Sequence, residues 1–220
     1  MYVAVHTGSN ISMDGIFMKK AWKRLVICVL VAAFVWTGAL IRDKQMLRQE
    51  LVRLHVVGAS DSAEDQTLKL QLKDAIVSSL KEDMAKLRDG EEAIAYLREN
   101  LPKIETMANC FLQEAGSSDM ASVSLGMEEF PVRYYDTFTL PSGVYQSLRI
   151  IIGPGEGQNW WCVAIPGLCL PATTAGFEEA ASCAGFSDAL TETLEGEAEY
   201  EIRFWVLDAL GKLEIFLHRA

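Results

Sequence analysis

An uncharged apolar run of 17 residues near the N-terminus, from Leu25 to Ile41, constrains this chain more than any other feature. It follows a cationic cluster made of Lys19, Lys20, Lys23 and Arg24. Positive charge followed by an apolar run is typical of an export signal, and it favours an N-terminus inside and a domain outside. As a helix the run spans about 26 Å, just short of a hydrocarbon core of roughly 30 Å. The sequence therefore predicts a signal peptide or a single membrane anchor at residues 25–41.

The flanks of this run leave two questions open. Residues 1–24 form the expected cytoplasmic region, but Met18 also begins a conventional leader, so residues 1–17 need not be translated. Thr37, Gly38 and Ala39 offer a small-x-small site for signal peptidase, and both cleavage and retention remain compatible with the sequence. A buried core helix is the alternative, but such helices rarely have this pattern of flanking charge.

Charge is distributed unevenly along the chain. The formal net charge is −10, and the first 42 residues hold five of the 20 basic side chains but one of the 30 acidic ones. The rest of the chain therefore has 29 acidic and 15 basic side chains. Such a domain is repelled by phosphate backbones and by anionic lipid head groups. We expect no nucleic-acid partner, and contact with a membrane only through the N-terminal segment.

Residues 50–220 have the length of one domain. A strand is predicted at residues 51–57, followed by an amphipathic helix that ends near Gly90. A second helical pattern covers residues 93–111, and Pro102 either kinks this helix or starts a new one. After Gly116 the apolar period changes to two. The strands predicted from this period lie at residues 123–125, 130–135, 144–152 and 160–165.

The last 50 residues are less regular. Residues 171–198 are small, acidic and weakly patterned, which indicates a flexible insertion or a poorly packed helix. A final strand is predicted over residues 200–206 and a short closing helix over residues 207–217. The whole pattern predicts an α+β fold with helices packed on a mainly antiparallel sheet, preceded by an N-terminal hydrophobic export or anchor helix.

Three closely spaced glycines, Gly153, Gly155 and Gly157, precede the pair Trp160-Trp161. A dinucleotide-binding fingerprint must open a helix, whereas these glycines lead into an aromatic strand, so we interpret them as a structural loop. Neighbouring residues of a strand face opposite sides of the sheet. One tryptophan is therefore expected in the core and the other outside, where it can anchor a partner. The alternative is that segment 171–198 covers both indoles.

Cysteine usage suggests a disulfide in an oxidising compartment. Cys28 lies in the leader, and the later cysteines are Cys110, Cys162, Cys169 and Cys183. The pair Cys162 and Cys169 is the one expected to form a disulfide, which would contribute about 2.5 kcal/mol. Two independent buried thiols are the alternative. No metal site and no cofactor are expected, because the Cys-x₆-Cys spacing is too long for zinc and only two histidines follow the leader.

An enzyme would need a nucleophile and a base. Cys162 or Cys169 with His55 would suit a thiol hydrolase of peptidoglycan. A carboxylate pair would instead suit cleavage of glycosidic bonds, and the acidic residues considered are Glu128, Glu129 and Asp136. Neither set has a diagnostic motif, and we expect His55 to be exposed or at a sheet edge. No catalytic residue is assigned, and a cell-wall hydrolase remains the alternative function.

Three sequence blocks carry a resemblance to a known family. The first runs from Arg53 to Ser62, RLHVVGASDS, and the second contains LPSGVY at residues 140–145 followed by LRI at 148–150. The third and most specific is GxGxGxNWWCV at residues 153–163. Together they make residues 50–170 similar to the stage II sporulation protein R family.

This resemblance implies a secreted signalling protein without catalytic residues. Members are made in the forespore of endospore-forming bacteria and exported into the space between the forespore and mother cell membranes. There they trigger a membrane-embedded aspartic peptidase, which processes the precursor of the sigma-E factor. The residues that we consider for contact with this peptidase are Asn159, Trp160 and Trp161 of the third block, and Arg53, His55 and Asp61 of the first.

Overall fold

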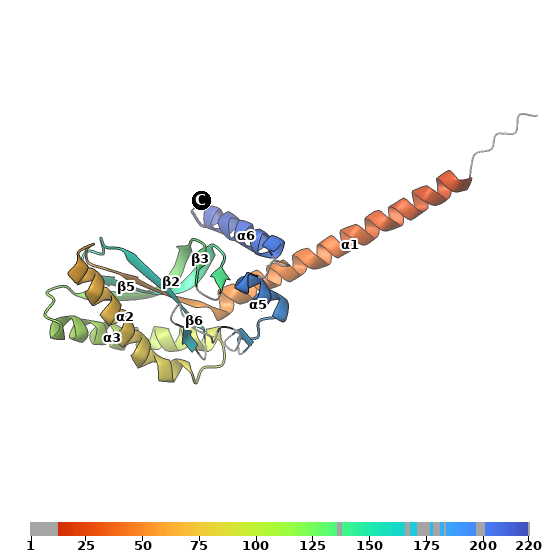
Figure 1. Ribbon diagram of the computed structural model, residues 1–220. Helices are drawn as coiled ribbons and strands as arrows, with labels where there is room; N and C mark the ends of the chain where they lie inside the picture. Colours follow the sequence, from red (N-terminus) through yellow and green to blue (C-terminus); the bar gives the residue numbers. More distant parts are fainter. Residues whose placement is uncertain are drawn as a thin grey trace, which may run out of the picture. The chain divides into compact units, whose positions relative to one another are not determined.

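The computed structural model describes residues 13–135, 138–165, 168–170, 177, 181–182, 184–196 and 201–219. The chain divides into two compact units, Met1–Ile41 and Arg42–Ala220. Helix α1 (Met13–Glu50) passes from the first unit into the second (Figure 1). Its stretch Ala21–Glu50 includes an 18-residue window of mean hydropathy 2.3 that is 6% buried. By length and composition this helix can cross a membrane, a test that a signal sequence also passes, and the predicted N-terminal hydrophobic helix is confirmed.

The second unit is built around a five-stranded sheet with the order β2-β5-β1-β6-β7. Its strands are β1 (Val52–Val57), β2 (Ala121–Phe130), β5 (Gly143–Ile152), β6 (Asn159–Ile165) and β7 (Leu168–Leu170). The central strand β1 pairs in parallel with β5, and the other three pairs of neighbours are antiparallel. A small hairpin joins β3 (Arg133–Tyr134) to β4 (Thr139–Leu140). The prediction of a mainly antiparallel sheet is therefore confirmed.

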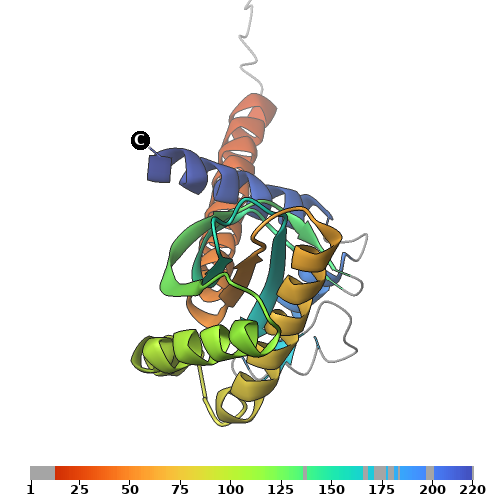
Figure 2. The same cartoon turned by 90° about the vertical axis from the view of Figure 1, so that its left-hand side faces the viewer.

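Two long helices, α2 (Ala63–Met84) and α3 (Gly90–Glu114), cover one face of this sheet (Figures 1 and 2). Side chains cap both N-termini, since Ser62 accepts from the amide of Asp65 and Asp89 accepts from that of Glu92. Pro102 lies inside α3, so this segment is one helix and not two. The main apolar core lies between these helices and the sheet. Its helix residues include Leu72, Ile76, Leu97, Ile104 and Leu112.

Helix α6 (Glu201–Arg219) lies against β5 on the opposite face of the sheet (Figure 1). The predicted final strand is therefore wrong over residues 201–206, and residue 200 lies outside the described ones. The residues from Ile202 to Val206 have strand propensity, but propensity is a weak prior that tertiary contacts override. Here Asp208 and Gly211, further along the helix, pack against Ser142 and hold this segment in a helix.

Segment 171–198 is described only in part. It contains α5 (Asp188–Glu195), which Ser187 caps and whose Leu190 and Leu194 are fully buried. Most of residues 171–183 lie outside the described residues, so the flexibility of the segment stays a prediction.

Candidate interaction face

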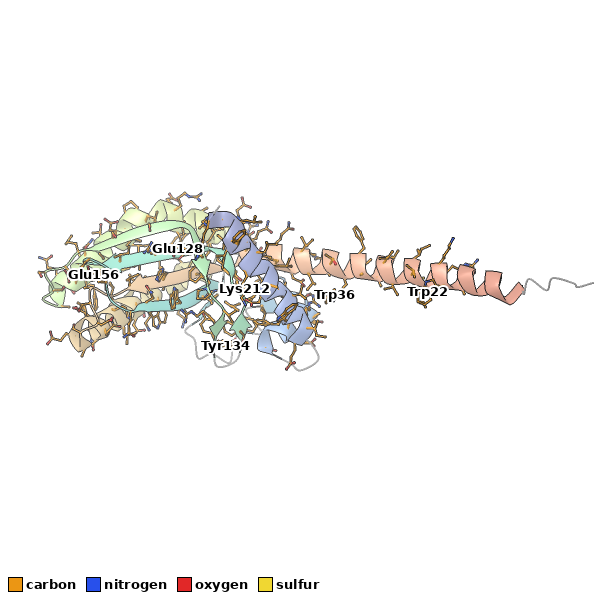
Figure 3. The ribbon with its side chains drawn as sticks, turned by 90° about the horizontal axis from the view of Figure 1, so that it is seen from above. Trp22, Trp36, Glu128, Tyr134, Glu156 and Lys212 are labelled. Carbon is orange, nitrogen blue, oxygen red and sulfur yellow. The ribbon has the colours of Figure 1, made fainter. Side chains whose placement is uncertain are left out.

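The strand register divides the side chains of β1 and β6 between the two faces of the sheet. Leu54 lies opposite Cys162 and Val56 opposite Trp160, and all four belong to or pack against the core beneath α2 and α3. The alternate positions face the other way, where His55 lies opposite Trp161. Figure 3 looks onto this second side and shows that α6 crosses one end of the sheet and leaves the rest uncovered by any described helix. We call this surface the His55 face. Its residues are His55, Glu128, Arg133, Arg149, Asn159 and Trp161.

His55 is the centre of a network that joins three strands. Its Nδ1 lies 3.2 Å from Glu128 Oε2 on β2, and its Nε2 lies 2.8 Å from Asn159 Oδ1 on β6. The ring also stacks on Trp161, with 5.5 Å between ring centroids. His55 is 9% exposed and belongs to the central strand, so the prediction of an exposed or edge histidine is wrong. The sequence could not show this, because both partners come from strands more than 70 residues away.

Glu128 is held as an ionised carboxylate. Burial by itself would raise its pKa, but the hydrogen bond with His55 and the positive charge of Arg149 outweigh this effect and hold the pKa below its ordinary value. Arg149 Nε lies 3.3 Å from the carboxylate. Glu129, its neighbour in the chain, pairs instead with His218 and Arg219 of α6. Asp136 lies outside the described residues.

The two tryptophans lie on opposite faces, as the period of the strand predicts. Trp160 packs against the core on the helix side, and the ammonium of Lys73 lies 4.8 Å from its ring centroid. Trp161 belongs to the His55 face, where the guanidinium carbon of Arg133 lies 3.4 Å from its ring centroid. Trp161 thus contacts both His55 and a cation, and it is only partly buried. Of this pair, Trp161 is therefore the one placed to anchor a partner on this side.

Arg53 lies beneath the His55 face and not on it. It is 0% exposed, and its guanidinium carbon lies 4.4 Å from the ring centroid of Phe130 and 5.3 Å from that of Tyr145. Its Nη2 donates to the hydroxyl of Tyr135 at 3.2 Å. Among the described residues, Nε and Nη1 have no hydrogen-bond partner. The structure therefore places Arg53 as an internal support of the face, out of reach of a partner.

The glycine loop is built for a close approach between two chain segments. The amide of Gly157 donates to the carbonyl of Gly58 at 2.9 Å, and a Cβ on Gly157 would lie 2.3 Å from the carbonyl oxygen of Ser60. Gly155 has a φ of +67°, which favours glycine. The loop precedes strand β6 and not a helix, which agrees with its interpretation as a structural loop.

Asp61 and Lys69 fasten the same two segments. Asp61 Oδ1 accepts from the amide of Gln158 at 2.8 Å, and Lys69 Nζ donates to the carbonyl of Gln158 at 2.8 Å. Burial lowers the pKa of Lys69, which the charge of Asp61 opposes. Asp61 is exposed at the end of the sheet where Asn159 begins β6. The first and third sequence blocks therefore meet at this point.

Cys162 lies on the wrong face to act with His55. It is 1% exposed in the core beneath the helices, and burial raises the pKa of its thiol to about 11. The side chain of Cys169 and the whole of Cys183 lie outside the described residues. The disulfide between Cys162 and Cys169 therefore stays a prediction.

Sequence reasoning missed two residues of the face and misjudged a third. The sequence does not single out Arg133, it marks Arg149 only as part of the LRI block at residues 148–150, and it offers Glu128 only as a member of a catalytic carboxylate pair. A signal for Arg149 was present, since it is a charged residue within the apolar strand 144–152. No such signal marked Arg133, whose contact with Trp161 depends on the hairpin β3–β4.

Comparison with known proteins identifies the family. The family model of stage II sporulation protein R matches residues 48–175, which include β1, β2, β5 and β6. Stage II sporulation protein R of Bacillus subtilis (strain 168) is 29% identical over 159 residues, which cover 67% of this chain and 70% of that protein. No solved structure matches the chain. The chain belongs to the stage II sporulation protein R family.

Proposed function

We propose that this protein is an exported signal of sporulation that triggers a membrane-embedded aspartic peptidase to process the precursor of sigma-E. Its place of action is the space between the forespore and mother cell membranes. The observation that carries the proposal is the family match over residues 48–175, because this range includes every residue of the His55 face. The match thus covers the part of the fold that bears the His55 face.

The N-terminal segment supports export. Cationic residues precede the apolar run, and the helix that contains the run can cross a membrane by length and composition. A chain with this leader delivers its acidic domain to the outer side of the cytoplasmic membrane. This is the compartment in which an extracytoplasmic part of the peptidase is accessible.

The chemistry of the His55 face supports recognition and not catalysis. Both ring nitrogens of His55 are engaged by other side chains, which leaves no nitrogen to take a proton from a nucleophile. Cys162 lies on the opposite face of the sheet. The depressed pKa of Glu128 is the reverse of what a general acid needs. None of these observations favours the cell-wall hydrolase.

Activation then follows from differential binding. A messenger shifts its target toward the active arrangement only if it binds that arrangement more tightly than the inactive one. A preference of a few kcal/mol is enough for a large change in population. Such a preference can come from a surface with an aromatic anchor at its centre and polar groups around it. The His55 face has this arrangement, with Trp161 as the anchor and Asn159, His55 and Arg133 around it.

Processing of the sigma-E precursor tests the proposal directly. The full chain is expressed in the forespore of a sporulating strain that lacks its own stage II protein R but has a peptidase from the matching species. We expect the immunoblot to show restored cleavage with the wild type and lost cleavage with Trp161→Ala. Met120→Ala is the matched control, because Met120 is exposed but lies outside the His55 face.

Two results would count against the proposal. One is the absence of cleavage by the wild type when export is confirmed. The other is turnover of purified peptidoglycan by the chain, which the exchange of His55 or Cys162 abolishes, since this would establish the hydrolase instead.

A further inference from the structure

Helix α6 exposes an apolar stripe to solvent. Five large apolar side chains of this helix are between 53% and 73% exposed, and they are Ile202, Trp205, Leu213, Phe216 and Leu217. Their spacing follows the turns of an α-helix, so they lie on one side of it. Apolar side chains gathered in this way mark a surface that contacts a partner or a membrane.

The other side of α6 is already docked on the sheet. Leu207 and Gly211 are buried there, and a Cβ on Gly211 would lie 1.6 Å from the carbonyl oxygen of Ser142. The amide of Ser142 donates to Asp208 Oδ1 at 3.0 Å. The helix therefore has two apolar sides, and in the described part of the chain only one of them is covered.

Side-chain bonds fasten α6 to the residues that directly follow the apolar run. Arg203 forms an ion pair with Asp43, and Lys44 Nζ donates to the carbonyl of Leu210 at 2.7 Å. Lys44 and Arg48 also pair with Glu214, at 3.0 and 3.3 Å. Asp43 and Lys44 are the second and third residues after Ile41, where the run ends. Chain connectivity thus keeps α6 close to the end of the apolar run.

The charges of α6 are arranged to suit a lipid surface. After Glu201 its acidic residues are Asp208 and Glu214, and both are bonded on the docked side, to Ser142 and Lys44. The stripe itself holds no acidic residue. Lys212 and Arg219 lie beside it with largely exposed side chains, and they form ion pairs with Asp208 and Glu129. Lys212 is labelled on α6 in Figure 3. An apolar side with Trp and Phe and cationic flanks is typical of helices that lie in the membrane interface.

We propose that the exposed side of α6 lies on the bilayer, with Trp205 and Phe216 inserted at the level of the lipid head groups. This adds a second membrane contact to the one expected from the N-terminal segment. It requires the apolar run to bring the chain to a membrane, but it does not depend on the signalling function. A domain held flat on the surface searches for a membrane-embedded partner in two dimensions.

Quenching by brominated lipids tests this contact in the full chain. The chain is reconstituted in vesicles of phosphatidylethanolamine and phosphatidylglycerol, with and without bromine on the acyl chains near the head group. The chain has five tryptophans, so subtracting the fluorescence of Trp205→Phe from that of the wild type isolates Trp205. We expect bromolipid to remove most of this difference and aqueous iodide to leave it. The matched control is the fluorescence of the wild type minus that of Trp161→Phe, which isolates Trp161. Bromolipid should leave this difference unchanged.

A second variant keeps the test decisive if the difference signal is small. Phe216→Glu places a charge within the stripe, and we expect it to abolish the quenching of Trp205, whereas Met120→Glu, exposed outside α6, should not. Quenching of Trp205 by iodide but not by bromolipid would overturn the proposal. The vesicles hold no peptidase, so neither result depends on whether the chain is a signal.

Discussion

Replacing Gly211 by alanine tests how α6 docks on the sheet. The added Cβ would lie 1.6 Å from the carbonyl oxygen of Ser142 and 2.5 Å from its carbonyl carbon. An ordinary carbon–oxygen contact is about 3.3 Å or longer, and a backbone carbonyl cannot rotate away as a side chain can. The helix must therefore move. Any such movement weakens the bonds from the amide and the hydroxyl of Ser142 to Asp208, which are 3.0 and 3.1 Å long.

The size of the effect follows from three contributions. Two hydrogen bonds are weakened at about 1 kcal/mol each. Overpacking at a tight contact costs about 1–3 kcal/mol. Alanine in a helix is more favourable than glycine by about 1 kcal/mol, which opposes the other two. The free energy of unfolding should thus fall by about 2–4 kcal/mol, which for a domain of this size lowers the melting temperature by roughly 4–16 °C.

Thermal unfolding of the full chain in detergent micelles, followed by near-ultraviolet circular dichroism, measures this change. Hydrogen exchange of the α6 amides shows whether the loss is local to that helix. Gly126→Ala is the matched control, because a Cβ on Gly126 meets no atom within 4 Å. If Gly211→Ala melted at or above the temperature of the wild type, helix propensity alone would have acted, and α6 would not dock on Ser142.

The remaining predictions concern the His55 face and the core beneath it. Glu128→Gln should lower the free energy of unfolding at pH 7 by about 1–3 kcal/mol, measured by urea unfolding. The pKa of the Glu128 carboxyl is depressed in the folded state. The stability that this carboxylate contributes is therefore present above about pH 4.5 and is lost as the pH falls through the folded pKa. Trp160→Ala should destabilise the fold by about 2 kcal/mol or more, whereas Trp161→Ala should retain the melting temperature and lose sigma-E processing. If the predicted disulfide between Cys162 and Cys169 forms, thiol titration of the denatured chain should find two fewer thiols before reduction than after it. Equal numbers of thiols before and after reduction would exclude this disulfide. A photo-cross-linker at Asn159 should capture the peptidase in sporulating cells, and one on the outer side of α2 should not.

The elements that could be predicted from the sequence are those in which local pattern and tertiary packing agree. Helix α2 carries its buried residues at helical spacing from Leu72 to Met84, and Ser62 caps it. The strand that begins at Asn159 follows a glycine loop and alternates between two faces, which was enough to place the two tryptophans on opposite sides. The family was also recognisable, because its blocks lie in β1, β5 and β6, where the strand register brings them together.

The elements that could not be predicted depend on contacts between distant segments. Residues 201–206 have a strand-like composition, and only the docking of Gly211 on Ser142, about 70 residues away in the chain, explains why they are helical. His55 has the same local sequence whether β1 is an edge or a central strand. Its burial results from the strand order β2-β5-β1-β6-β7, which carries Glu128 and Asn159 to the two ring nitrogens.

The two proposed surfaces constrain each other, because α6 and the His55 face lie on the same side of the sheet (Figures 1 and 3). The docked side of α6 faces the sheet, so its apolar stripe points away from the sheet, in the direction that the His55 face also looks. If the stripe rests on a bilayer, the His55 face looks toward the membrane across a gap of about one helix diameter, roughly 10 Å. A gap of this width admits a short extracytoplasmic loop of a membrane-embedded protein and excludes a folded soluble domain. The cross-link from Asn159 should therefore map to loops of the peptidase that lie close to the membrane, and a cross-link to a part far from the membrane would mean that α6 does not lie on lipid while the signal is given.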